Sequence, residues 1–211
     1  MTTPVLTLYH HPRSRSAGIR VLLEALGVDY QVQPLDFAKG ETRTPQFLAI
    51  NPLGKLPTVV HGEAVITEQV AITIYLADRF PAAGLAPAFD DPRRGAYLRW
   101  LAYYGACFEP AMVDHAFKRE PLPASQSPYS DYETVIHTII DQFGRGEYLL
   151  GDRLSAADLL WGVALKLTTD FGLVPRHPRI IAYAERIEAH PACRRARALD
   201  AELAGAMGLA T

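Results

Sequence analysis

The chain has 211 residues, a formal net charge of −2 and 49% hydrophobic residues. This hydrophobic content supports a folded core, and the near-neutral charge argues against a dedicated nucleic-acid-binding protein. There is no run of about 18 apolar residues, as a membrane span needs, and no secretory signal is visible, so we expect a cytoplasmic protein that contacts neither membrane nor nucleic acid. The 2 cysteines, Cys107 and Cys193, are too few for a disulfide framework or a Cys-rich zinc site.

The first elements predict a β-α-β unit. Residues 5–9 form a short apolar run typical of a strand. Residues 19–26 then repeat apolar side chains at the spacing of one helical face, and Gly27 stands where a helix-ending glycine belongs. Residues 30–35 predict a second strand, so the two strands and the helix between them form one crossover unit.

A hairpin and a further helix follow. Residues 57–60 and 64–67 are strand-like and flank a short turn-like insert, which predicts a hairpin. Apolar residues over 71–76 predict the next helix. We therefore expect residues 1–80 to form a domain that mixes strands and helices.

The rest of the chain has a helical pattern. Residues 81–92 contain prolines and a glycine and predict a linker. Residues 93–211 show almost no strand-like alternation, so we expect an all-helical domain there, interrupted by a loop where prolines gather between residues 121 and 128. Helices fit near residues 93–118, 129–143, 155–171, 178–190 and 192–206.

The turn between the first strand and the first helix carries candidate chemistry. Residues 9–16 read YHHPRSRS. Unpaired N–H groups and the helix dipole favour negative charge at a helix N-terminus, so a serine there either caps the helix or donates to an anion or thiolate. A thioredoxin-type redox pair needs two cysteines in this turn, and serine and arginine occupy those positions.

Two further positions point to a ligand. Pro57 begins a strand without an N–H to donate, which suits an edge strand or a cis peptide bond. A cis bond turns the main-chain groups of Leu56 outward, where an extended ligand can pair with them. Glu68 and Gln69 lie in the first turn of the next helix, where an acid stabilises the dipole; for Glu68, holding an ammonium group is the alternative role.

In order and spacing, these segments resemble the glutathione S-transferase superfamily. The matching motifs are LYHHPRS at 8–14, NPLGKLP at 51–57 and TEQVAI at 67–72, and the likeness extends over about residues 5–205. In the helical half, Ser155 and Asp158 match the family's capping box. The resemblance implies an α+β fold with a thioredoxin-like, glutathione-binding N-terminal domain, an all-α domain that lines the acceptor-substrate cavity, and a homodimer.

The resemblance also implies a role for each matching residue, with glutathione as co-substrate and with no metal or nucleotide. The main chain of Leu56 would pair with the cysteinyl unit of glutathione across a cis bond to Pro57. Gln69 stands where the family usually has serine, although an amide still bonds a carboxylate. The residues implied in glutathione binding are Leu56 and Pro57 for the cysteinyl unit, Glu68 and Gln69 for the γ-glutamyl end, and Lys55 and Arg43 for the glycyl carboxylate.

The residue that activates the thiol has several candidates. A free thiol has a pKa of about 8.5 and is mostly protonated at neutral pH, so a hydrogen-bond donor must favour the thiolate. Alignment with serine-type members makes Ser14 the first candidate, whereas Ser16 resembles part of the first helical turn. Alignment with tyrosine-type members, also without gaps, places Tyr9 at the catalytic tyrosine and Arg15 at an assisting arginine.

The second substrate would lie against the helix over residues 93–118. Tyr104, Phe108 and Met112 are candidates for the wall of its pocket, and packing in the core is the alternative for such an aromatic stripe. The 7 histidines show no metal-ligand spacing. We expect a glutathione transferase that conjugates the glutathione thiolate to small hydrophobic electrophiles; the alternatives are a glutathione-dependent isomerase or peroxidase, or a non-catalytic binding protein of the same fold.

Overall fold

The chain folds into two compact units in a computed structural model that describes residues 5–209. The sheet unit combines the chain up to Ala83 with the segment from Pro191 onward, and the helical unit comprises Gly84–His190. This division differs from the predicted all-helical domain over 93–211, because the last helix packs with the sheet unit.

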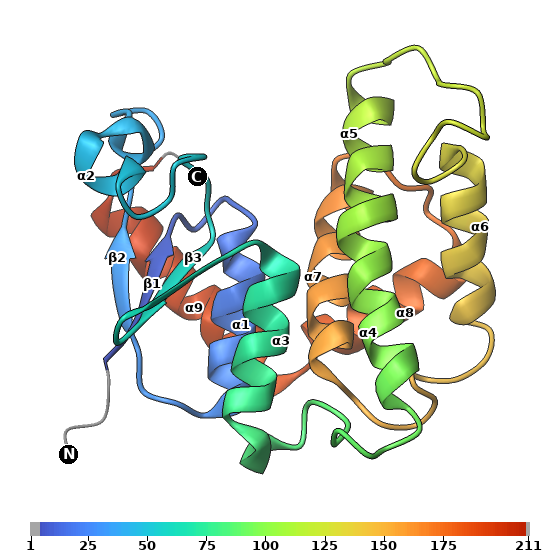
Figure 1. Ribbon diagram of the computed structural model, residues 1–211, viewed down its shortest axis with the longest axis horizontal. Helices are drawn as coiled ribbons and strands as arrows, with labels where there is room; N and C mark the ends of the chain where they lie inside the picture. The colour runs from blue at the N-terminus through green and yellow to red at the C-terminus, as the bar shows by residue number, and fades with distance from the viewer. Residues whose placement is uncertain (1–4, 210–211) are drawn as a thin grey trace. The chain divides into compact units, whose positions relative to one another are not determined.

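A four-stranded mixed sheet is the centre of the sheet unit (Figure 1). The strand order is β2-β1-β3-β4, with β1 parallel to β2 and antiparallel to β3, and with β3 and β4 forming the predicted hairpin. Helix α1 (Ser16–Leu26) connects the parallel pair, as the β-α-β pattern predicts. The strands are β1 (Leu6–His10), β2 (Gln31–Pro34), β3 (Thr58–His61) and β4 (Ala64–Thr67).

Three helices pack together in this unit. The long helix α9 (Pro191–Ala206), drawn in red in Figure 1, packs against α1, and α3 (Gln69–Arg79) packs on another part of α1. Gly27 ends α1 at φ +66° and donates its N–H to the carbonyl of Leu23 at 3.1 Å, the left-handed cap that glycine adopts without steric cost.

Short helical segments account for much of what the sequence pattern missed. They are η1 (Glu41–Arg43), α2 (Pro45–Leu48) and η2 (Pro81–Ala83). Helix α2 begins with a Thr44 cap and a proline in its first turn, but its 4 residues are too few for a helical repeat to show in a sequence.

The helical unit is built around α7 (Ala156–Asp170), most of whose residues are buried. One predicted helix is interrupted: residues 93–118 form α4, a π-helical segment η3 and α5, because Pro110 has no N–H for the α-helical bond to the carbonyl of residue 106. The other helices are α4 (Arg94–Tyr103), η3 (Tyr104–Phe108), α5 (Glu109–Ala116), α6 (Tyr132–Gln142) and α8 (Pro178–Glu188).

The buried carboxylate of Asp158 fixes the start of α7. It accepts the Ser155 N–H at 2.8 Å, as in the predicted capping box, and also accepts the Ser155 hydroxyl at 2.6 Å. The Leu149 N–H and the Tyr183 hydroxyl each donate to its other oxygen at 2.7 Å. Burial raises the pKa of this carboxyl above its ordinary value, and the four donors oppose that effect.

Helices α7 and α8 approach closely at Gly162. A Cβ atom placed there would lie 2.4 Å from the Cβ of Ile187, so only glycine fits at this contact. Over residues 5–209, no helix combines the length and the apolar character that a membrane span requires.

Candidate functional site

Three segments converge at one end of the sheet. Tyr9 pairs with Thr58 across β1 and β3, and Thr58 pairs with Thr67 across β3 and β4. The end of β1, the start of β3 and the end of β4 therefore lie at the same end of the sheet, which we call the binding edge. The segments beyond that edge contain the residues that the sequence analysis assigned to the thiol and to glutathione.

The loop before β3 is held in a single shape. Asn51 is buried, and its amide donates to the carbonyl of Lys55 at 2.9 Å and to the hydroxyl of Thr58 at 3.0 Å. Gly54 has φ +59°, and a Cβ there would lie 2.6 Å from the carbonyl oxygen of Thr42. These contacts fix the path of the loop, which leaves the Lys55 side chain exposed.

Leu56 ends this loop with its main chain available for pairing. The Leu56–Pro57 peptide bond is cis, which confirms the predicted geometry. Within residues 5–209, neither the N–H nor the carbonyl of Leu56 takes part in a hydrogen bond. An extended peptide-like ligand can satisfy both groups, as an added strand does.

Glu68 stands at the start of α3 in a rare backbone conformation. Its φ is +64° and its ψ is +124°, a combination that side-chain-bearing residues seldom adopt. The side chain is exposed and forms no capping hydrogen bond to α3. Capping therefore does not account for the acid at this position, and strained residues of this kind gather at functional sites.

Gln69 and Arg43 are also at this edge, and each is anchored in part. The Gln69 amide donates to the carbonyl of Arg15 at 3.0 Å, which ties the start of α3 to the turn before α1. Arg43 is exposed and donates one N–H to the carbonyl of Leu53 at 3.2 Å. A guanidinium has five N–H donors, so Arg43 retains donors for a carboxylate.

Ser14 lies in the turn that leads into α1. Its half-buried hydroxyl is 2.6 Å from the hydroxyl of Ser16 and 2.9 Å from the carbonyl of His11, and it accepts the Ser16 N–H at 3.1 Å. Ser16 is the first residue of α1 and is buried, so of the two hydroxyls only that of Ser14 is accessible to a ligand.

The tyrosine-type candidates are arranged differently. Tyr9 points to the face of the sheet opposite to that of His10, and its ring packs against Phe47 with centroids 5.4 Å apart. Arg15 is exposed at the N-cap position of α1 and forms no side-chain capping bond.

A buried polar chain that the sequence pattern did not predict lies behind the two serines. The Ser16 hydroxyl is 2.8 Å from His10 Nδ1, and His10 Nε2 is 2.9 Å from an Asp200 carboxylate oxygen. Arg20 donates to that same oxygen at 2.6 Å. A signal was present, because Arg20 and Asp200 both interrupt faces of α1 and α9 that are otherwise mostly apolar and small.

The three acceptor-pocket candidates lie in the core of the helical unit. Tyr104 and Phe108 pack on Trp161, with ring centroids 5.3 Å and 4.9 Å apart, and Met112 is 3% exposed. They are core residues in this structure, which is the alternative that the sequence pattern left open.

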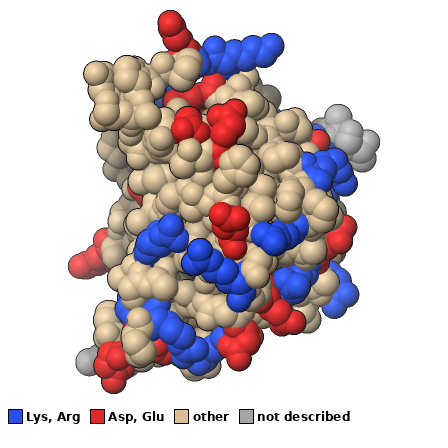
Figure 2. Space-filling view, turned by 90° about the vertical axis from the view of Figure 1, so that its right-hand side faces the viewer, with Lys and Arg blue, Asp and Glu red and all other residues tan. Residues whose placement is uncertain are grey.

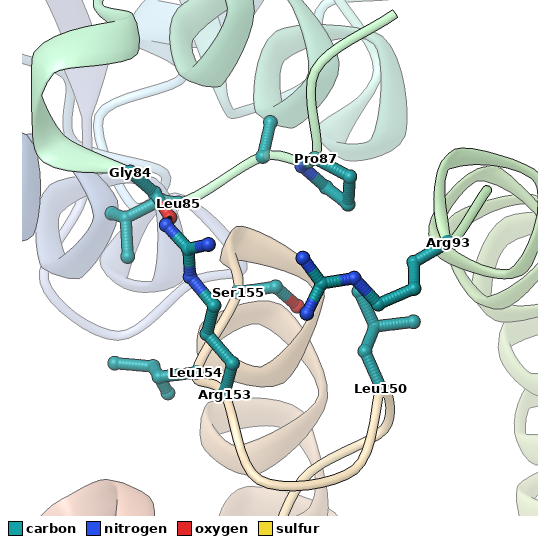
Figure 3. A pocket seen from close by; sticks show the side chains of 9 residues that line it. Gly84, Leu85, Pro87, Arg93, Leu150, Arg153, Leu154 and Ser155 are labelled. Carbon is teal, nitrogen blue, oxygen red and sulfur yellow. Dashed lines mark hydrogen bonds between the residues drawn. The ribbon is translucent and has the colours of Figure 1, made fainter. Parts of the chain in front are cut away.

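The crevice shown in Figure 3 is too small to receive a substrate. It lies within the helical unit between Arg93 and Arg153, over the start of α7, and its volume of about 10 Å³ holds no more than one water molecule. On the face of the molecule in Figure 2, acidic and basic side chains are interspersed. Across residues 5–209, no cluster of three or more His, Cys, Asp or Glu is placed to hold a metal ion.

The fold and the edge site define a class. A mixed sheet of order β2-β1-β3-β4 with a cis-proline before β3, joined to an all-helical unit, is the thioredoxin-like architecture that the resemblance implied.

Known proteins agree with this class. The family described as Glutathione S-transferase, N-terminal domain, matches residues 4–78. A glutathione S-transferase of Arabidopsis thaliana is 32% identical over 167 residues, which cover 74% of this chain and 77% of the relative. The chain therefore belongs to the glutathione S-transferase family of enzymes.

Solved structures show the same likeness over almost the whole chain. A glutathione transferase from Methylococcus capsulatus has a TM-score of 0.79 and 27% identity, covering 94% of this chain and 100% of its own. A sphingomonad glutathione S-transferase, complexed with glutathione, has a TM-score of 0.77 and 26% identity, covering 97% of this chain and 100% of its own.

Proposed function

We propose that this protein conjugates the thiolate of glutathione to small hydrophobic electrophiles, with Ser14 as the residue that donates to the sulfur. The observation that carries the proposal is the convergence at one sheet edge of the accessible Ser14 hydroxyl and the unpaired main chain of Leu56. The relative complexed with glutathione supports the choice of ligand.

The charges at the edge match the two ends of glutathione. The ligand carries an ammonium and a carboxylate at its γ-glutamyl end and a second carboxylate at its glycyl end. In this proposal the exposed Glu68 carboxylate holds the ammonium and Gln69 donates to the neighbouring carboxylate. Lys55 and Arg43 meet the glycyl carboxylate, and Leu56, next to Pro57, pairs with the cysteinyl unit between them.

The proposed chemistry is nucleophilic attack by sulfur. Placing the thiol at the N-terminus of α1 next to a hydroxyl donor favours the thiolate, the reactive form. The sulfur electron pair forms a bond to an electrophilic carbon, and the leaving group departs with the electrons of the broken bond. Binding the two reactants together supplies most of the remaining acceleration.

The same proposal includes a small hydrophobic acceptor substrate, assembly as a homodimer and a cytoplasmic location. Glutathione-dependent isomerisation or peroxide reduction would use the same thiolate, and a non-catalytic protein would bind glutathione without turnover. A panel containing an activated aryl halide, a peroxide and an isomerisable double bond distinguishes these outcomes.

The experiment compares three variants, each of which removes a single hydroxyl group. Ser14→Ala removes the proposed donor, Tyr9→Phe removes the rival donor, and Ser125→Ala removes an exposed serine far along the chain as a control. Calorimetry measures glutathione binding, ultraviolet absorbance measures the bound thiolate, and aryl halide turnover measures kcat. We expect Ser14→Ala to bind glutathione but lose thiolate and kcat by about 100-fold, as for removal of a key transition-state donor.

Two results would contradict the proposal. Full thiolate and turnover in Ser14→Ala, together with their loss in Tyr9→Phe, would reassign the donor to Tyr9. If the unaltered protein does not bind glutathione, then conjugation and non-catalytic glutathione binding are both excluded.

A further inference from the structure

The hydroxyl of Ser14 is the outer end of a continuous hydrogen-bonded chain. Ser14 Oγ and Ser16 Oγ are 2.6 Å apart, and Ser16 Oγ is 2.8 Å from His10 Nδ1. His10 Nε2 is 2.9 Å from Asp200 Oδ1. All four residues belong to the sheet unit, and His10 is fully buried, so the chain runs from an accessible hydroxyl to a ring with no exposed surface.

The positions of the protons in this chain follow from its inner end. Arg20 donates to Asp200, and an ionised carboxylate only accepts hydrogen bonds, so His10 Nε2 must be the protonated nitrogen that donates to it. In the neutral ring Nδ1 is then an acceptor, and the single proton of the Ser16 hydroxyl points toward it. The 2.6 Å contact between the serines then has Ser14 donating to Ser16, and the His11 carbonyl, 2.9 Å from Ser14 Oγ and 3.2 Å from Ser16 Oγ, is the other acceptor within reach of these two protons.

This orientation has a consequence for the thiol. With its only proton directed to Ser16 or to the His11 carbonyl, the Ser14 hydroxyl has none to give to a thiolate, and its outward side is an acceptor. Ser14 becomes a donor toward the sulfur only when each proton moves one place inward. That shift ends with a proton on His10 Nδ1.

We propose that His10 takes up the proton of the glutathione thiol through Ser14 and Ser16, and so acts as a positioning residue that makes Ser14 a donor. This inference rests on the proposed role of Ser14. The S–H bond breaks as an O–H bond forms at Ser14, the Ser14 proton passes to Ser16, and the Ser16 proton passes to His10 Nδ1. The electron pair stays on sulfur. After the leaving group has departed, the proton on His10 passes back through Ser16 and Ser14 to water.

The surroundings of His10 suit a proton acceptor. The Asp200 carboxylate from α9 lies 2.9 Å from His10 Nε2, where it can accept a hydrogen bond from an imidazolium, and Arg20 from α1 donates to the same oxygen at 2.6 Å. His11, the next residue, adds no charge near neutral pH because burial lowers its pKa from 6.5. The imidazolium and the thiolate then form an ion pair across two hydroxyls, as in enzymes that pair a reactive sulfur with histidine.

The decisive test counts protons. Glutathione and S-methylglutathione are each bound by the full chain near pH 7 in two buffers that differ in ionisation enthalpy. The difference between the two ligands gives the protons released by thiol ionisation alone, and absorbance gives the amount of thiolate. We expect thiolate to form with no net proton released, because the proton stays on His10.

A spectroscopic readout locates the proton directly. The imidazole nitrogens of ¹⁵N-labelled protein should show His10 Nδ1 becoming protonated with glutathione and remaining unprotonated with S-methylglutathione. A purely structural role for the His10–Asp200 pair predicts the same nitrogen shifts with both ligands, which would overturn the proposal.

Ser16→Ala breaks the chain and leaves His10 and Asp200 in contact. We expect Ser16→Ala to bind S-methylglutathione normally and to form at least about tenfold less thiolate than the unaltered protein. It should release one proton for each thiolate that does form. Ser16→Thr retains a hydroxyl and should restore retention of the proton. His10→Gln tests the acceptor itself, and circular dichroism shows which variants are folded.

The possible failures are distinguishable. If the unaltered protein forms thiolate and releases one proton with each, the proton goes to solvent and the role of His10 is refuted, while Ser14 keeps its proposed function. If the unaltered protein binds glutathione without forming thiolate, both proposals are refuted.

Discussion

The backbone conformation of Glu68 lowers the free energy of unfolding by an amount that substitutions at this position can measure. Its backbone has φ +64° and ψ +124°, where a residue with a side chain carries a cost of about 1–3 kcal/mol. Glycine avoids that cost, but its freer unfolded chain lowers stability by about 0.4–1 kcal/mol relative to alanine. Glu68→Gly should therefore be more stable than Glu68→Ala by about 1–2 kcal/mol.

The comparison with alanine isolates the backbone, because both variants lack the carboxylate. Urea denaturation should give the difference in unfolding free energy, and Tm should be higher in Glu68→Gly by about 2–8 °C for a chain of this size. Both variants should lose affinity for glutathione, since neither can hold its ammonium group. At Glu185, which is exposed within α8, the same pair of changes should have the opposite sign, with glycine less stable by about 1 kcal/mol.

A single result would refute this reasoning. If Glu68→Gly is no more stable than Glu68→Ala while the Glu185 pair behaves normally, the backbone at Glu68 is not strained. Retained ammonium binding in either variant, measured as unchanged glutathione affinity, would remove Glu68 from the proposed site.

Three further predictions concern the helical unit. Asp158→Ala leaves the buried N–H groups of Leu149 and Ser155 without their acceptor and should lower the unfolding free energy, measured in urea, by about 3–5 kcal/mol. A loss under about 1 kcal/mol would contradict the importance of the Asp158 hydrogen bonds. Because burial raises the pKa of Asp158 above 3.8, the folded chain binds more protons than the unfolded chain above that pH. This contribution to stability is complete below 3.8 and is lost as pH rises through the folded value, so Asp158→Asn should lack that part of the pH dependence in parallel denaturation series. Gly162→Ala should cost about 1–3 kcal/mol by crowding Ile187, and adding Ile187→Ala should recover part of the loss; strictly additive losses would contradict the contact.

Local patterns were sufficient for most elements of the fold. The strands are short apolar or β-branched runs and the long helices repeat apolar side chains at helical spacing, and the Ser155–Asp158 capping box marked the start of α7 to the residue. The interruption of the helix over 93–118 was less visible, because a proline such as Pro110 is tolerated in the first turn of a helix and does not by itself mark a break. Only the three-dimensional structure shows the π-helical segment before it. Helix α2 was too short for any period.

The site was predictable only where it is local. The cis bond at Pro57 follows from a short motif, and so does the position of Ser14 in the turn before α1. The link between His10 and Asp200 spans 190 positions along the chain, and no period or motif relates such distant residues. Their pairing emerges only when α9 is found to pack against α1.

The return of α9 to the sheet unit also bears on the order of events during synthesis. The helical unit, Gly84–His190, is continuous in sequence and has been synthesised in full before α9 is made. The sheet unit begins first, yet Asp200 reaches His10 and Arg20 only after nearly the whole chain has left the ribosome. Domains usually fold in the order of their synthesis, but here the first unit to start is the last to complete its buried polar chain. A ribosome-bound nascent chain stalled before Asp200 would therefore present Ser14 in its turn without the acid that orients His10.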